Sequence, residues 1–104
     1  MALDANTGGE IDLKEAKGYI DEFGIKYPDE VKAFFIGSNQ VAKILEQENC
    51  IGIRIYNGYD LETEKMNQVM VGVDDREKDM TDGIILDRMR PCPSYCDSSS
   101  ALMS

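Results

Sequence analysis

The sequence predicts an α+β fold, with two or three N-terminal helices packed on a small, mainly antiparallel sheet. Apolar residues recur at helical spacing in the N-terminal half, whereas two later stretches alternate with a period of two. A chain of 104 residues has the length of one domain. We therefore expect a flexible N-terminus over residues 1–9, a single α+β domain over residues 10–96 and a flexible, Ser-rich tail over residues 97–104.

The first predicted helix begins at Asp12, which can cap its N-terminus, and Glu15 follows three residues later, as in a capping box. Gly24 is a natural C-terminal stop. One apolar stripe runs along this helix and consists of Leu13, Ala16, Ile20 and Phe23.

The next stretch, residues 31–36, fits both helical spacing and alternation, so helix and strand stay open there. Ser38 is then a candidate N-cap for a second helix that closes at Asn49. The buried stripe of that helix consists of Val41, Ile44 and Leu45.

Two strands follow, because β-branched residues alternate at residues 51–55 and again at residues 69–73. Asn57-Gly58 is a hairpin signal, but a turn there would force the acidic run after it into a strand. We therefore place the turn of one long hairpin within residues 60–65. Residues 74–79 read as a polar loop, and residues 84–86 as a third strand or a short helix. Pro91 and Pro93 are expected to prevent regular structure around Cys92.

Composition excludes several functions. The chain has no His, 11 basic residues and 20 acidic residues, and its formal net charge is −9. Without His it lacks the usual general base near neutral pH and the commonest metal ligand, so Ser-His-Asp and Cys-His catalysis within the chain are excluded. The negative charge disfavours nucleic acid and anionic membrane surfaces as partners. We predict no catalytic residue and no cofactor.

The three cysteines are the remaining candidates for a chemical role. Cys92 and Cys96 form a C-x₃-C pair, which differs from the C-x₂-C of thioredoxin-like and zinc-knuckle sites. Three interpretations stay open for the pair: unremarkable terminal thiols, a disulfide within or between chains, and a metal or redox role. Cys50 is expected to be a small buried hydrophobe. A three-thiolate site formed by all three cysteines is the alternative; A-type iron–sulfur carriers distribute their cysteines similarly, but with a C-x-C pair.

Two polar groups have mainly structural interpretations. Asp75, Glu77 and Asp79 alternate as in a calcium loop, but the Gly and Glu that an EF-hand requires are replaced by Met80 and Leu86, so we interpret them as a solvated loop. Arg54 lies on the strand face opposite the isoleucines, beside Tyr56. It is either exposed or paired with carboxylates across the hairpin.

Three patterns in the second half of the chain are GIRIY at residues 52–56, VGVD at residues 71–74 and CPSYC at residues 92–96. In this order the chain resembles a family of short, uncharacterised bacterial proteins with GIR-Y, VGVD and CP-x-x-C patterns. The resemblance spans residues 34–96. It implies a bacterial cytoplasmic protein in which the terminal cysteines recur, but it implies no activity.

We predict a non-enzymatic, acidic protein-interaction module that acts through a protein partner or as a homo-oligomer, because a small sheet has edges that need covering or pairing. The alternative is a thiol-based metal-binding or redox protein that uses the C-terminal Cys pair. A third interpretation is a small-ligand binder that uses Tyr and Met side chains near the sheet. The N-terminus lacks signal-peptide character and the number of cysteines is odd, so we expect a cytoplasmic location.

Overall fold

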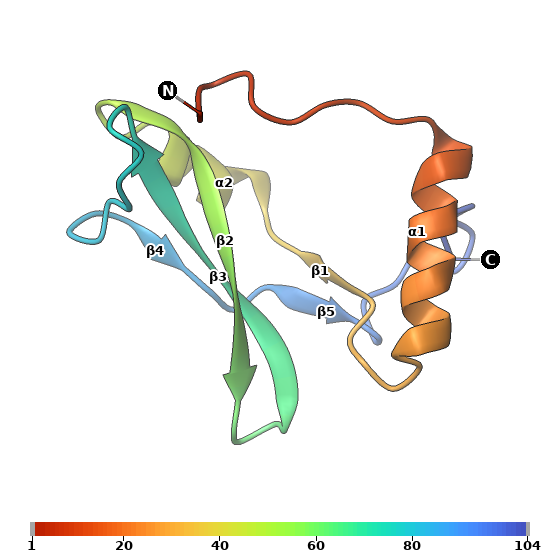
Figure 1. Ribbon diagram of the computed structural model, residues 1–104. Coiled ribbons are helices and arrows are strands. Elements are labelled where there is room, and N and C mark those ends of the chain that lie inside the picture. Colours follow the sequence, from red (N-terminus) through yellow and green to blue (C-terminus); the bar gives the residue numbers. More distant parts are fainter. Residues whose placement is uncertain (1, 104) are drawn as a thin grey trace. The chain divides into compact units, whose positions relative to one another are not determined.

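A computed structural model describes residues 2–103. Figure 1 shows their helices and strands: α1 (Leu13–Lys26), β1 (Ala33–Phe35), α2 (Ser38–Leu45), β2 (Cys50–Asp60), β3 (Lys65–Asp74), β4 (Ile85–Leu86) and β5 (Arg90–Cys92). β2, β3 and β4 form a three-stranded sheet in that order, and β1 pairs with β5; all pairings are antiparallel. The predicted α+β class is confirmed.

The described residues form two compact units. The first, which we call the hairpin unit, comprises residues 2–7 and 36–89; the second, the terminal unit, comprises residues 8–35 and 90–103. α2 and the three-stranded sheet belong to the hairpin unit, and α1 and the two-stranded sheet belong to the terminal unit. The single domain expected over residues 10–96 stays a prediction.

In the terminal unit, α1 begins as predicted. The Asp12 side chain accepts a hydrogen bond of 2.7 Å from the backbone N–H of Glu15. The predicted stop at Gly24 is wrong: the helix continues to Lys26, and Tyr27 closes it by donating its N–H to the Phe23 carbonyl. Gly24 stays in the helix because its φ is not left-handed, and only a left-handed glycine makes the usual C-terminal cap.

The two-stranded sheet resolves one open question and corrects one prediction. Residues 33–35 are a strand, so the stretch that fitted both patterns is extended at its centre. The expectation that prolines prevent regular structure around Cys92 is wrong, since Pro91 lies inside β5 opposite Phe34. Both strands of a two-stranded sheet are edges, and proline is tolerated at an edge because its missing N–H can face away from the partner.

The hairpin unit is built on β2 and β3, whose register runs from Cys50 opposite Asp74 to Asp60 opposite Lys65. The turn occupies residues 61–64, which confirms the predicted position. A register irregularity between Cys50 and Gly52 marks a bulge at the proximal end. Residues 85–86 are a strand, which decides between the two structures expected for this segment.

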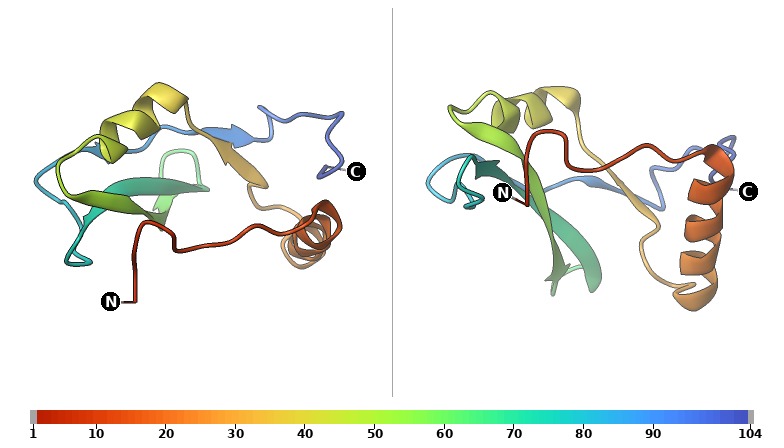
Figure 2. Two further views of the ribbon diagram at one scale, coloured as in Figure 1. Left: turned by 90° about the horizontal axis from the view of Figure 1, so that it is seen from above. Right: turned by 45° about the horizontal axis from the view of Figure 1, so that its top comes forward.

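α2 contacts both β2 and β3 (Figure 2). It begins at Ser38, and Gly37 rather than Ser38 occupies the cap position without a side-chain hydrogen bond, so the predicted Ser38 cap is wrong. It also ends at Leu45, four residues before the predicted Asn49. Ile44 has an exposed fraction of 0% and lies against Gly72 of β3. Ile44 and the buried β3 residues Met70, Val71 and Val73 belong to the core of the hairpin unit.

Gln47 holds the loop before β4 beside α2. Its side-chain amide donates to the Ile44 carbonyl at 3.0 Å, and its side-chain oxygen accepts from the Ile84 N–H at 2.9 Å. Gly83 allows this approach, because a Cβ at that position would overlap the Gln47 side-chain oxygen. The loop is therefore fixed by one side chain and one glycine.

Candidate functional site

The terminal unit contains a pocket of about 680 Å³. Apolar side chains make up much of its lining: Ile20 and Phe23 come from α1, Ala33 from β1, and Leu102 and Met103 from the C-terminal segment. This volume is in the range of small-molecule and cofactor sites, which are mostly apolar with a few polar groups. The pocket supplies such polar groups from Asp21, Lys32 and Ser100.

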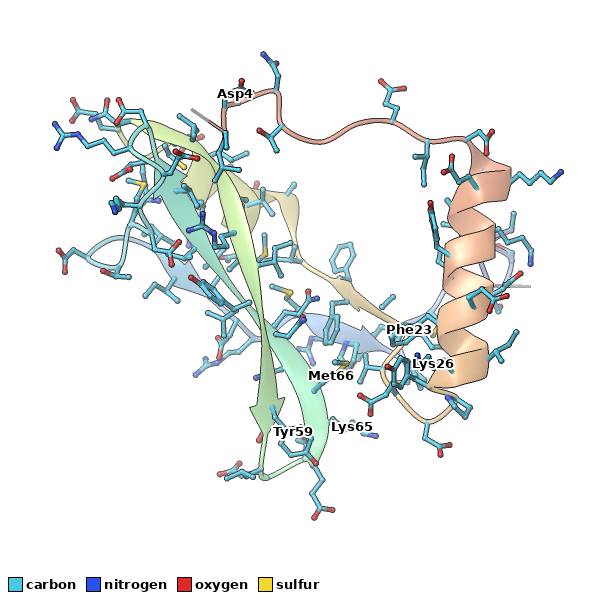
Figure 3. All side chains as sticks on the ribbon, viewed as in Figure 1. Asp4, Phe23, Lys26, Tyr59, Lys65 and Met66 are labelled. Atoms are coloured by element: carbon cyan, nitrogen blue, oxygen red, sulfur yellow. A yellow bond between two sulfur atoms is a disulfide. The ribbon has the colours of Figure 1, made fainter. Side chains whose placement is uncertain are left out.

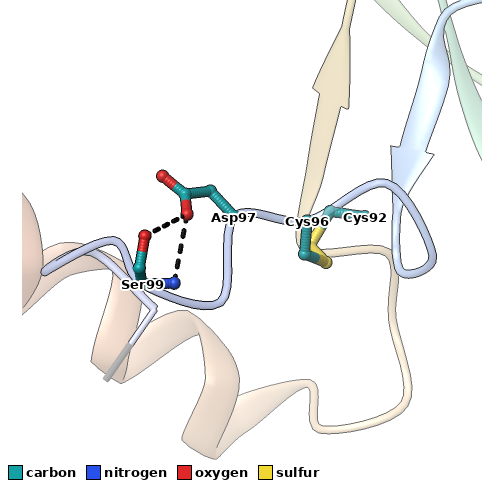
Figure 4. Close-up of a disulfide and its surroundings, with 4 residues drawn as sticks. All are labelled: Cys92, Cys96, Asp97 and Ser99. Atoms are coloured by element: carbon teal, nitrogen blue, oxygen red, sulfur yellow. Dashed lines mark hydrogen bonds between the residues drawn. A yellow bond between two sulfur atoms is a disulfide. The ribbon is translucent and has the colours of Figure 1, made fainter.

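A disulfide lies in the lining of this pocket. It joins Cys92, at the end of β5, to Cys96, with a Cα–Cα distance of 4.8 Å (Figure 4). The environments of its two halves differ: Cys92 is 3% exposed, whereas Cys96 is exposed to solvent. The structure thus brings together two of the three cysteines singled out in the sequence.

The loop of the disulfide and the segment after it are held by local contacts. The Tyr95 N–H donates to the Pro91 carbonyl at 2.9 Å, and the Arg90 guanidinium lies 5.4 Å from the centre of the Tyr95 ring. Asp97 accepts hydrogen bonds from the hydroxyl and the backbone N–H of Ser99, which lower the pKa of the Asp97 carboxyl. The flexible tail expected over residues 97–104 stays a prediction, although four of its residues line the pocket.

The hairpin unit offers a second candidate surface, the distal half of the β2–β3 hairpin. Ile55, Tyr56 and Tyr59 of β2 are all exposed, as is Leu61 in the turn. Figure 3 shows Tyr59 and Lys65 at the far end of this hairpin. β2 pairs only with β3 among the described strands, so its other edge presents unpaired backbone groups.

Arg54, Tyr56 and Asp79 form one polar cluster in the hairpin unit. Arg54 pairs with the Asp79 carboxylate at 2.5 Å, and the Tyr56 hydroxyl donates to its other oxygen. The Tyr56 hydrogen bond, assisted by Arg54, lowers the pKa of Asp79, and the same hydrogen bond raises the pKa of Tyr56. The cluster connects the loop after β3 to β2. Of the two interpretations of Arg54, exposed or paired with a carboxylate, the structure shows the paired one.

The other predicted candidates do not converge on a metal site. Cys50 is a free, half-buried thiol whose sulfur lies 3.3 Å from the Gly52 carbonyl oxygen. In the acidic loop, Asp74 accepts hydrogen bonds from the backbone of Arg76 and Lys78, which lower its pKa. Over residues 2–103, no group of three or more acidic or Cys side chains is placed to hold a metal ion.

Sequence reasoning missed the pocket. Its lining comes from two segments about 60 residues apart, and no motif connects them. It also missed Gln47, because no sequence motif marks a half-buried Gln that follows a helix. The signal that could have been followed was the apolar pair Leu102 and Met103 at the end of a polar, Ser-rich segment.

Comparison with known proteins adds no relative: no family model fits the sequence, and no curated protein or solved structure matches it. Within residues 2–103, no helix combines the length and apolar character needed to cross a membrane.

Proposed function

We propose that the protein is an interaction module that pairs the free edge of β2 with the same strand of a second copy. The observation that carries the proposal is an 11-residue strand whose second edge no described strand covers. Unpaired strand edges accept a further strand through main-chain hydrogen bonds. Strand pairing requires no catalytic residue and no cofactor.

β2 carries little of the usual protection against such pairing. Natural edge strands are short, bulged, or carry charged side chains, especially Lys, or Pro. β2 has neither Lys nor Pro, its charged residues are Arg54 and the terminal Asp60, and its bulge lies at the proximal end, away from the exposed half. In the exposed half, Ile55 and Tyr59 are 53% and 61% exposed. These side chains lie on the same face of the strand and gain cover when a second strand is added.

One antiparallel register suits the sequence of β2. When Asn57 lies opposite Asn57 of the second copy, Ile55 lies opposite Tyr59 and Tyr56 opposite Gly58, and each pair occurs twice because of the two-fold symmetry. The same register places Arg54 opposite Asp60. Arg54 already pairs with Asp79, so the apolar contact between Ile55 and Tyr59 is the main reason to favour this alignment.

The experiment is sedimentation velocity over a range of protein concentrations with Ile55→Glu, Tyr59→Lys and the double variant. Each single substitution breaks two symmetric cross-strand contacts of roughly 0.2–1 kcal/mol each. We therefore expect dissociation to increase about tenfold, which corresponds to about 1.4 kcal/mol. In the double variant the carboxylate introduced at position 55 would meet the ammonium group introduced at position 59 across the interface, so association recovers.

Ile85→Glu is the matched control, because Ile85 has nearly the same exposed fraction as Ile55 but lies on β4, at the opposite edge of the sheet. It should leave self-association unchanged. A wild-type protein that stays monomeric at millimolar concentration contradicts the proposal, and so does an Ile55→Glu protein that associates as wild type does.

A further inference from the structure

We infer that Cys96 is a site of thiol–disulfide exchange with a low-molecular-weight thiol, and that this exchange releases the C-terminal side of the pocket in the terminal unit. The inference is independent of strand pairing by β2. It rests on two observations: the unequal exposure of the two sulfur-bearing residues, and the position of their disulfide between β5 and the segment that completes the pocket.

Access decides which sulfur reacts. A thiolate must reach a disulfide sulfur directly, and the rate depends on which sulfur is accessible. Cys92 is 3% exposed, while Cys96 lies in a loop whose residues 93–97 are all exposed. An incoming thiolate therefore attacks Cys96 Sγ, and Cys92 becomes the leaving group.

The exchange has two steps. In the first, the thiolate forms a bond to Cys96 Sγ, the Cys92–Cys96 bond breaks, and its electron pair leaves with Cys92 Sγ, which takes a proton from solvent. In the second, another thiolate attacks the small thiol's sulfur in the mixed disulfide, and Cys96 leaves as a thiolate and is protonated. Two small thiols are oxidised to one disulfide, and the protein disulfide is reduced to two thiols.

The two cysteines are anchored differently after this reaction. Cys92 remains in β5, where it lies opposite Ala33 and its carbonyl accepts from the Lys32 N–H at 2.7 Å. Cys96 follows the strand. The disulfide cross-links it to β5, whereas the hydrogen bond from the Tyr95 N–H to the Pro91 carbonyl and the Arg90–Tyr95 contact hold only the loop before it. The pocket-lining residues that come after Cys96 include Ser100, Leu102 and Met103. Reduction therefore loosens this side of the pocket and leaves the β1–β5 side in place.

The first measurement compares the two thiols in full-length protein that carries Cys50→Ser, which removes the third thiol and keeps a hydroxyl near the Gly52 carbonyl. Cys92→Ala and Cys96→Ala are each added to it, and the remaining thiol is exposed to glutathione disulfide. Intact-mass spectrometry follows the adduct. We expect Cys96 to react about tenfold faster than Cys92 or more, since a buried thiol reacts only after local opening. Equal rates, or a faster Cys92, overturn the inference.

The second measurement leaves Cys92 and Cys96 unchanged. It therefore tests the inference even if Cys92→Ala fails to fold. Methyl NMR spectra of the Cys50→Ser protein are recorded in the oxidised state and after reduction by glutathione. We expect the Leu102 and Met103 methyl signals to shift, while the Val71 methyls of the hairpin unit stay in place. Unchanged Leu102 and Met103 signals after complete reduction overturn the inference, as does a pair that forms no disulfide under glutathione disulfide.

Discussion

Replacing Ile44 by Ala should destabilise the hairpin unit more than any exposed substitution. Ile44 is 0% exposed, and its Cγ2 would lie 3.2 Å from a Cβ placed on Gly72. The substitution removes three buried carbon atoms, which contribute about 0.8 kcal/mol each. The cavity left behind adds a further cost, and comparable substitutions total about 2–5 kcal/mol.

We therefore expect a loss of about 3–4 kcal/mol in the free energy of unfolding. A protein of this length has a total of roughly 5–15 kcal/mol, so the change removes a large share of the stability. Urea unfolding followed by far-UV circular dichroism measures the loss, and hydrogen exchange of β3 amides assigns it to the hairpin unit. Ile55→Ala is the matched control, because the same atoms are removed from a side chain that is 53% exposed.

A double variant tests the geometry of this contact. A Cβ at Gly72 would also lie 2.8 Å from the Gln47 amide nitrogen and 3.2 Å from the Cys50 sulfur. Gly72→Ala alone is therefore destabilising, and it should cost less in the Ile44→Ala background, where one of the three close contacts is absent. The reasoning is refuted when Ile44→Ala costs less than about 1 kcal/mol, which is closer to the roughly 0.5 kcal/mol of an exposed substitution than to the expected loss, or when the two changes are simply additive.

Three further changes test individual side chains. Tyr56→Phe should raise the pKa of Asp79 towards its ordinary value, because it removes the main hydrogen bond that lowers it; a carboxyl ¹³C titration that shows no change contradicts this. Since the folded pKa of Asp79 is depressed, its contribution to stability is present above the unfolded pKa and is lost as pH falls through the folded pKa, and the variant should lose part of that acid-side dependence. Gln47→Ala should speed hydrogen exchange at the Ile84 amide, which loses its acceptor; unchanged exchange argues against the tie. Asp12→Ala should cost about 0.5–2 kcal/mol of helix stability and Asp12→Asn far less, and equal losses in α1 helicity would rule out capping.

The features that the sequence predicted correctly depend on interactions between residues close to one another in the chain. The Asp12 cap needs only residues three apart, and the alternating residues on either side of residues 60–65 specify the hairpin and its turn. The predictions fail where the conformation of a segment depends on the structure around it. The expectation that Pro91 excludes a strand is wrong. Pro91 lies opposite Phe34 in a two-stranded sheet, where every strand is an edge, and an edge tolerates a residue without an N–H. The expectation that Gly24 ends α1 is wrong, because no left-handed turn forms there.

Of the candidate sites, the exposed sheet edge could be predicted from the sequence, whereas the pocket and the disulfide could not. A small sheet with exposed edges follows from the sequence pattern alone, since a sheet of few strands cannot cover all its edges. The pocket could not be predicted, because α1 and the C-terminal segment meet only through tertiary packing. The sequence leaves the pairing of Cys92 and Cys96 open among three alternatives. Their spacing permits a disulfide, but the rotation of the loop between them decides whether the sulfurs meet.

The most direct test of strand pairing is a single cysteine at its two-fold axis. Asn57→Cys in the Cys50→Ser protein places two thiols opposite each other in the proposed register, within the Cα separation that a disulfide allows. Mild oxidation should then give a covalent dimer, seen by mass after denaturation. Gln68→Cys is the matched control, because Gln68 lies opposite Asn57 but on β3, one strand away from the β2 edge. β4 pairs with β3 only at Met70 and Val71, so cross-linking at residue 68 would report pairing through the edge of β3 instead. Efficient cross-linking at residue 57 and little at residue 68 is the predicted result. Absent cross-linking at residue 57, or equal cross-linking at the two positions, contradicts the pairing of β2 with a second copy.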